Sequence, residues 1–257
     1  MSRHRSLVPL ASLALLLASA CSSADRGATG PNAHTVSLSF STKRPAGAIV
    51  AGGNQSSFLT LGTATDTIVI TKAQVVLSKV ELATADSVTC TTTDSSSECE
   101  ELHADPELVD LPVDQSVMTA LLTAIPAGTY TKFEAHVRLV KSTDVGGSAF
   151  LATHPEFSGV SVRVEGTFNG TPFVYTGTAG AELELEFAPP LVVDSTGMNI
   201  TVNVDLSSWF MNGSGGLVDP ATANSGGPNE SLVAHNIHQS FEAFEDDNKD
   251  GHSDSQP

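Results

Sequence analysis

The most specific chemical pattern in this sequence lies in its last residues. Acidic and amide side chains alternate around Gly251 in "DDNKDGHSD", and the candidate ligands are Asp246, Asn248, Asp250, His252 and Asp254. Calcium takes six to eight oxygen ligands, and alternating side chains in a tight turn bring their oxygens to one centre. The pattern therefore predicts a structural calcium loop over residues 246–257, in which His252 would supply its backbone carbonyl.

This loop differs from an EF-hand at its last position. The twelfth residue is Pro257, where an EF-hand has a bidentate Glu, and no second helix is expected. The pattern is therefore similar to the half-loops of thrombospondin-type repeats and dockerins, and it predicts weak binding, with a Kd of about 0.1–1 mM. The alternative is an acidic tail whose spacing is accidental.

Two other groups of side chains could carry chemistry. His235 and His238 are three residues apart in a predicted helix, so they share a face and could hold copper or zinc, but no HExxH pattern or third ligand accompanies them. The carboxylates of residues 182, 184 and 186 alternate along a predicted strand, which favours a solvated face or an edge strand protected against aggregation. Neither a hydrolase motif nor a phosphate-binding motif is present, so we do not expect an enzyme.

Cys90 and Cys99 bracket the polar run "TTTDSSSE". In an oxidising compartment, two cysteines that close so short a loop are expected to form a disulfide at a hairpin tip. A thiolate pair on a metal is the alternative, but the spacing differs from a C-x₂-C knuckle.

Alternation of apolar and polar residues along most of the chain predicts the fold class. "TKFEAHVRLV" places Phe133, Ala135 and Val137 on one face, and "MNITVNVDL" alternates five apolar residues with Asn and Thr on a predicted wet face. Asn169-Gly170 between two such runs predicts a tight hairpin. We expect a mainly β protein, an antiparallel β-sandwich of about eight to ten strands, over residues 34–245.

Two segments are expected to be helical. Residues 114–124, "DQSVMTALLTA", predict a short connector helix. Residues 230–245, "ESLVAHNIHQSFEAFE", predict a C-terminal helix whose apolar stripe contains Val233, Ile237, Phe241 and Phe244.

The first residues are typical of an export signal. Residues 1–20 have a basic start, a short apolar run and small residues before Cys21, as in a secretory signal peptide. The Ala-Ser-Ala-Cys junction resembles a bacterial lipobox, which implies lipidation of Cys21, a tether over residues 21–33, and an outer-membrane lipoprotein of a Gram-negative-type bacterium. The alternative is an ordinary cleaved signal peptide.

The charge excludes one class of partner. Without residues 1–20 the chain has 10 basic and 29 acidic residues, a formal charge of −19. Such a field repels nucleic acid and attracts cations. We expect no nucleic-acid partner, attachment to the membrane through lipid alone, and an unknown protein or glycan partner.

Three segments carry a resemblance to a known type of domain. They are "ITKAQVVLSKVEL", "LVDL" and "IPAGTYTKFEAHV", which follow one another within residues 34–141. The set resembles a β-sandwich domain of unknown function in bacterial lipoproteins, with its Pro-Ala-Gly-x-Tyr turn. A weaker similarity is to the periplasmic copper-associated proteins of methanobactin gene clusters, although that family's Gly-x-Asp-type stretch after the turn and its later tryptophans have no counterparts here. The first resemblance implies fold and location, and the second implies copper handling.

Overall fold

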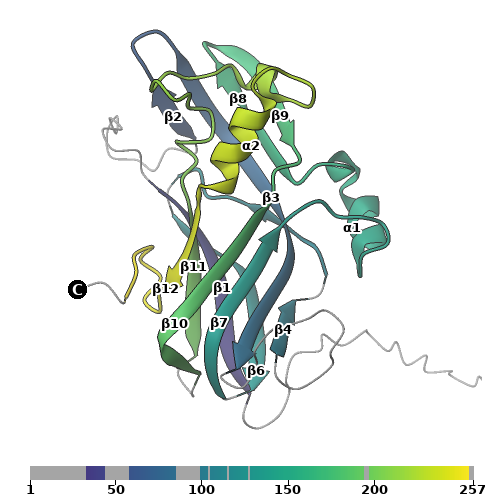
Figure 1. Cartoon of the computed structure of the whole chain (residues 1–257), viewed down its shortest axis with the longest axis vertical. Coiled ribbons are helices and arrows are strands. Elements are labelled where there is room, and N and C mark those ends of the chain that lie inside the picture. The colour runs from purple at the N-terminus through teal and green to yellow at the C-terminus, as the bar shows by residue number, and fades with distance from the viewer. Residues whose placement is uncertain are drawn as a thin grey trace, which may run out of the picture.

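Two packed β-sheets form the molecule, as a computed structural model shows (Figure 1). The structure describes residues 33–43, 58–84, 99–103, 105–114, 116–126, 128–193 and 197–254. These residues contain twelve strands and two short α-helices, so the predicted β-sandwich is confirmed, with more strands than the expected eight to ten.

The larger sheet has eight strands and is built around β3 (Thr67–Thr84). Its main order is β10-β7-β3-β8-β9, and three short strands also pair with β3. The other seven members are β2 (Leu59–Gly62), β4 (Cys99–His103), β5 (Glu107–Asp110), β7 (Gly128–Val137), β8 (Val162–Phe168), β9 (Thr171–Gly177) and β10 (Ala181–Val193). Because β3 is 18 residues long, it pairs with β8 along its first half and with β7 along its second half.

The smaller sheet has the order β12-β11-β1-β6. Its strands are β1 (Ala33–Thr42), β6 (Val117–Pro126), β11 (Met198–Val204) and β12 (Phe241–Glu245). The two central strands, β1 and β11, run parallel, while both outer pairs are antiparallel. This sheet brings the beginning of the described chain next to its end.

The main core lies between the two sheets. Inward residues of β1 and β11, such as Phe40 and Val202, are completely buried, as are Leu82 on β3 and Phe133 on β7. Each large apolar side chain buried in this way stabilises the fold by about 1.5–3 kcal/mol. Trp209, in the loop after β11, is also fully buried in this core.

The predicted hairpin at Asn169-Gly170 is confirmed. Strands β8 and β9 pair from Val162↔Gly177 to Phe168↔Thr171, which leaves a two-residue turn. Both turn residues have positive φ, 51° and 81°, as tight hairpins of this kind require.

The predicted connector helix over residues 114–124 is wrong, because most of this segment belongs to β6. It pairs with β1 from Ala33↔Pro126 to Ser41↔Val117. The backbone groups along this edge of β1 need hydrogen-bond partners, and β6 supplies them. That requirement outweighs the modest helix preference of residues such as Met118 and Leu121.

The predicted C-terminal helix over residues 230–245 is only partly correct. Helix α2 spans Glu230–His238, and Val233 and Ile237 are buried on it as expected. Ser240 ends it: its Oγ donates to the carbonyl of Ile237 (2.7 Å) and accepts from Nε1 of Trp209 (2.7 Å). The chain then continues as β12. Phe241 and Phe244, the other two residues of the predicted stripe, therefore lie in a strand beside β11.

Three short helical elements were not predicted. Helix α1 (Gly147–Thr153) and the 3₁₀ turn η1 (Pro155–Phe157) connect β7 to β8, and a second 3₁₀ turn, η2 (Pro220–Ala223), precedes α2. Phe150 and Phe157 form a small separate apolar cluster with Val76 and Val140. No helix among the described residues has both the length and the apolar character needed to span a bilayer.

Candidate functional site

The predicted calcium loop follows β12 directly and lies beside the smaller sheet, near the C-terminal end of the ribbon in Figure 1. Its first residue, Asp246, is completely buried. The carboxylate accepts three hydrogen bonds, from Oγ1 of Thr201 (2.7 Å), the N–H of Asp250 (3.0 Å) and the N–H of Gly251 (3.0 Å). All three donors are neutral, so these bonds stabilise the carboxylate without neutralising its charge.

Polar side chains of β1 and β11 form a buried network beneath this loop. Asn199 accepts from Ser37 and Ser39, each at 2.7 Å, and its amide nitrogen donates to Thr201 (2.9 Å) and to the carbonyl of Asp246 (2.8 Å). The sequence predicts that Asn199 and Thr201 are exposed to solvent, yet both are buried. The prediction is wrong because the chain end covers this face of the sheet.

The remaining predicted ligands of the calcium loop organise its backbone. Oδ1 of Asn248 accepts from the N–H of Asp250 (2.8 Å), and Oδ1 of Asp250 accepts from the N–H of His252 (2.9 Å). Asp254 accepts from the N–H of Asp247 (2.6 Å) and from Nδ2 of Asn248 (3.0 Å). The five predicted ligands therefore lie in one hydrogen-bonded loop.

Glycine is required at the bend of the loop for two reasons. Gly251 has φ 81°, a conformation that residues with a Cβ rarely adopt. A Cβ at this position would also lie 3.2 Å from Cγ2 of Val117 on β6. The glycine therefore allows both the bend and the close approach of the loop to the sheet.

The loop does not hold its acidic groups in a ready metal-binding cluster. Within the described part of the chain, no three His, Cys, Asp or Glu side chains are placed to hold one ion. Instead, oxygens of Asp246, Asn248 and Asp250 each accept N–H groups of the loop itself.

Negative charge accumulates next to the loop at the end of β12. Burial raises the pKa of the Glu245 carboxyl, and the nearby charges of Asp247 and Asp254 raise it further. A cation bound in the loop would counteract this repulsion.

The predicted histidine pair is exposed on α2. His235 and His238 both face solvent, and Nδ1 of His238 lies 2.9 Å from the carbonyl oxygen of Gly180. Copper or zinc binding by this pair stays a prediction.

The predicted ladder of glutamates lies on an edge strand. Glu182, Glu184 and Glu186 are exposed on β10, which ends the main path of the larger sheet. Glu184 pairs with Lys132 of β7 (2.5 Å), and hydrogen bonds from Lys132 to Glu134 and Glu184 raise the pKa of this lysine. A charged edge of this kind opposes pairing with another chain.

The predicted lipidation and disulfide sites fall mostly outside the described residues. Residues 1–32, with Cys21, and residues 85–98, with Cys90, belong to that part of the chain, while Cys99 is the first residue of β4. The signal peptide, the lipid and the disulfide therefore stay predictions.

Comparison with protein-family models, curated proteins and solved structures gave no match. The resemblances drawn from the sequence motifs thus stay predictions. The proposals below depend on the residues of this chain and on their geometry.

Proposed function

We propose that this chain is an envelope lipoprotein, anchored to the outer membrane through Cys21, whose β-sandwich is a non-enzymatic binding or structural module. The export signal and the lipobox-like junction support the location. The two packed sheets support a compact module. A protein or a glycan would be its partner.

We further propose that the loop after β12 binds one calcium ion, which fixes the chain end against the smaller sheet. The observation that carries this proposal is the fully buried Asp246 carboxylate, whose hydrogen bonds come from neutral donors. Oδ1 of Asn248 and Oδ1 of Asp250 each accept one N–H of the loop, and such oxygens have a second lone pair for a cation. Asp254 and the carbonyl of His252 would complete a weak site of oxygen ligands.

Calcium titration tests the loop. We expect residues 22–257 to bind one calcium ion by isothermal titration calorimetry, with a Kd of about 0.1–1 mM and a higher Tm when calcium is present. Asp250→Ala removes one ligand and should abolish both effects. Glu182→Gln, which changes the charge by the same amount on β10, should bind calcium like the wild type.

An absence of heat and of any Tm shift in the wild type would contradict the calcium proposal. The same titration with copper and zinc tests the alternative of metal handling. Stoichiometric uptake that His235→Ala and His238→Ala abolish would replace calcium binding with that function.

A further inference from the structure

Strand β6 is an outer strand of the smaller sheet, and no described strand pairs with its far edge. It pairs with β1 alone, from Ala33↔Pro126 to Ser41↔Val117. β4 lies near β6 but pairs with β3. Backbone N–H and C=O groups along such an edge are free to pair with a further strand. The smaller sheet can therefore be extended at β6.

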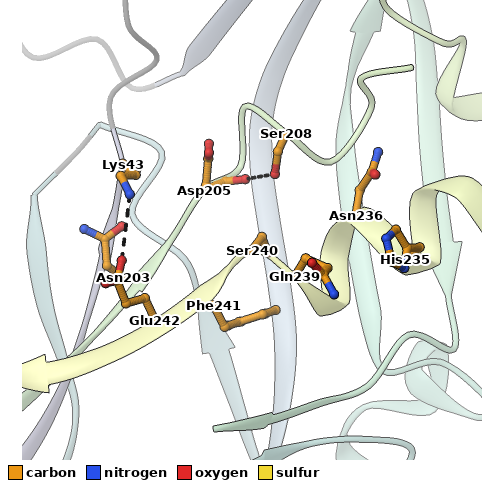
Figure 2. A pocket seen from close by; sticks show the side chains of 10 residues that line it. All are labelled: Lys43, Asn203, Asp205, Ser208, His235, Asn236, Gln239, Ser240, Phe241 and Glu242. Carbon is orange, nitrogen blue, oxygen red and sulfur yellow. Dashed lines mark hydrogen bonds and ion pairs between the residues drawn. The ribbon is translucent and has the colours of Figure 1, made fainter. Parts of the chain in front are cut away.

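The other edges of the two sheets are protected against such pairing. β10 exposes the glutamates of residues 182, 184 and 186, and β12 exposes Glu242 beside a polar cleft (Figure 2). On β9, Oδ1 of Asn224 accepts from the N–H of Thr176 (2.8 Å), and its Nδ2 donates to the carbonyl of Val174 (3.3 Å). β2, β4 and β5 have only four or five residues each, and so short an edge offers few groups.

β6 has no comparable protection along its second half. None of its ten residues is charged, although the chain has a formal charge of −17. The register with β1 shifts at Ala120, which is an extra residue opposite Leu38 and Ser39. From Leu121 to Ile125 the strand is regular, and within it Leu122 is 67% exposed.

The distribution of charge favours a second copy of this chain as the partner. Two copies that paired through β10 would bring carboxylates face to face, which is destabilising. Two copies that paired antiparallel through β6 would bring only uncharged residues together. With Thr123 opposite Thr123 of the second copy, Leu122 would lie opposite Ala124. The pairing would end at Pro126, which has no N–H to donate.

The acidic C-terminal loops would stay apart in this arrangement. Each loop contacts the first half of its own β6, where Nζ of Lys249 donates to Oγ1 of Thr119 (3.4 Å). Thr119 of one copy and Thr119 of the other would be eight residues apart along the pair, about 27 Å. Because the Debye length is about 8 Å at physiological ionic strength, repulsion between the two loops would be screened.

We propose that β6 forms a symmetric dimer of this chain by antiparallel pairing with β6 of a second copy. The two four-stranded sheets would then form one continuous sheet across the dimer, and Leu122 would become partly buried between the copies. One pair of strands is a small interface, so we expect a micromolar dissociation constant. The dimer uses neither the lipid nor calcium.

Sedimentation equilibrium of the lipid-free chain, residues 22–257 in EDTA, tests the proposal. We expect the average mass to rise with concentration from that of one chain towards that of two. Leu122→Lys should weaken the dimer at least tenfold without a change in Tm, because two lysines would meet diagonally across the pair. Val192→Lys makes a similar change on β10, at a residue that is 65% exposed, and should leave the dimer intact.

Hydrogen exchange identifies the strand that pairs. Amides of residues 121–125 should exchange more slowly at high protein concentration than at low concentration, because pairing protects those that face outward. Leu122→Lys should remove this dependence on concentration. Amides of β9, whose edge Asn224 already covers, should exchange at the same rate throughout.

The proposal would be overturned by the mass of a single chain at every concentration. It would also be overturned by a dimer that Leu122→Lys leaves intact, by one that both lysine variants weaken equally, or by β6 amides whose exchange does not depend on concentration. Because the measurements use EDTA and a chain without lipid, such a failure is separate from failure of the calcium or lipoprotein proposals.

Discussion

Asp246 shows how a single buried carboxylate organises the end of this chain. It accepts hydrogen bonds from β11 through Thr201 and from the loop through two N–H groups. A buried charge is destabilising unless its acceptor sites are occupied, so the loop and the strand must both be in place around it. The residue therefore connects the order of the loop to that of the sheet.

We expect Asp246→Asn to lower the free energy of unfolding by about 2–3 kcal/mol. The NH₂ group of the amide would face an N–H or O–H group that donates to the carboxylate in the wild type, so that hydrogen bond would be lost. Urea unfolding in EDTA measures this without any contribution from calcium. Glu182→Gln makes the same change of charge at an exposed position and should stay within about 0.5 kcal/mol of the wild type. A loss below 0.5 kcal/mol for Asp246→Asn would show that these hydrogen bonds contribute little.

Glu245, one residue earlier, gives the fold a dependence on pH. Its pKa in the folded chain lies above its ordinary value of 4.5, because of burial and the charges of Asp247 and Asp254. The folded state thus holds the proton more tightly than the unfolded chain. The protonated Glu245 carboxyl therefore favours the folded state at low pH. This contribution to the free energy of unfolding is lost as the pH rises from the pKa of the unfolded chain through the higher pKa of the folded chain.

Glu245→Gln should therefore be more stable than the wild type at pH 7 and close to it at pH 3.5, where the glutamate is protonated in both states. Chemical unfolding across this range in EDTA measures the difference. Glu182→Gln, far from the loop, serves as the reference for a change of charge. An equal effect of Glu245→Gln at both pH values would contradict the assigned pKa direction.

Among the elements, β12 determines where the calcium loop lies. Phe241 and Glu242, at its beginning, line a polar cleft with Asn203 of β11, and the calcium loop follows its last residue, Glu245. Five strand residues span about 16 Å, so the cleft and the loop lie at opposite ends of one strand. Because β12 pairs with β11, which carries both Asn199 and Asn203, a change in this pairing would alter the surroundings of the loop and of the cleft.

The predicted disulfide would join Cys90, which lies outside the described residues, to Cys99, the first residue of β4. Closing so short a loop should add about 2–3 kcal/mol to the free energy of unfolding under oxidising conditions. Cys90→Ser should lose this contribution, and a reducing agent should remove it from the wild type alone. Peptide mapping without reduction would show the linked Cys90 and Cys99 peptides, and free thiols at both positions would contradict the pairing.

At the scale of the whole molecule, charge and anchoring decide where the sandwich can act. The acidic chain has no electrostatic attraction to anionic lipid headgroups, so the proposed membrane attachment depends on the lipid at Cys21. A single acyl chain holds a protein only marginally, whereas the several chains of a modified N-terminal cysteine give stable anchoring.

We therefore expect the wild-type chain to enter the detergent phase of a Triton X-114 separation and to incorporate labelled palmitate, when it is expressed in a Gram-negative host. Cys21→Ser should lose both properties. The internal substitution Cys99→Ser should keep them and is the control for a lost cysteine. An unlabelled wild type in the aqueous phase would favour the ordinary signal peptide.

Local sequence signals specify the fold class, one hairpin and the residues of the C-terminal loop. Period-two alternation and the Asn169-Gly170 turn are local signals, set by strand geometry and by positive φ. The loop is local as well, since its side chains bind backbone groups only a few residues away.

The other features depend on contacts between residues far apart in the chain, so no local pattern predicts them. Residues 117–126 are a strand since β1 needs hydrogen bonds along its edge, and residues 241–245 are a strand because β11 does. Asn199 and Thr201 are buried because the chain end folds over them. The cleft, too, combines residues from β11, α2 and β12 that no local pattern connects.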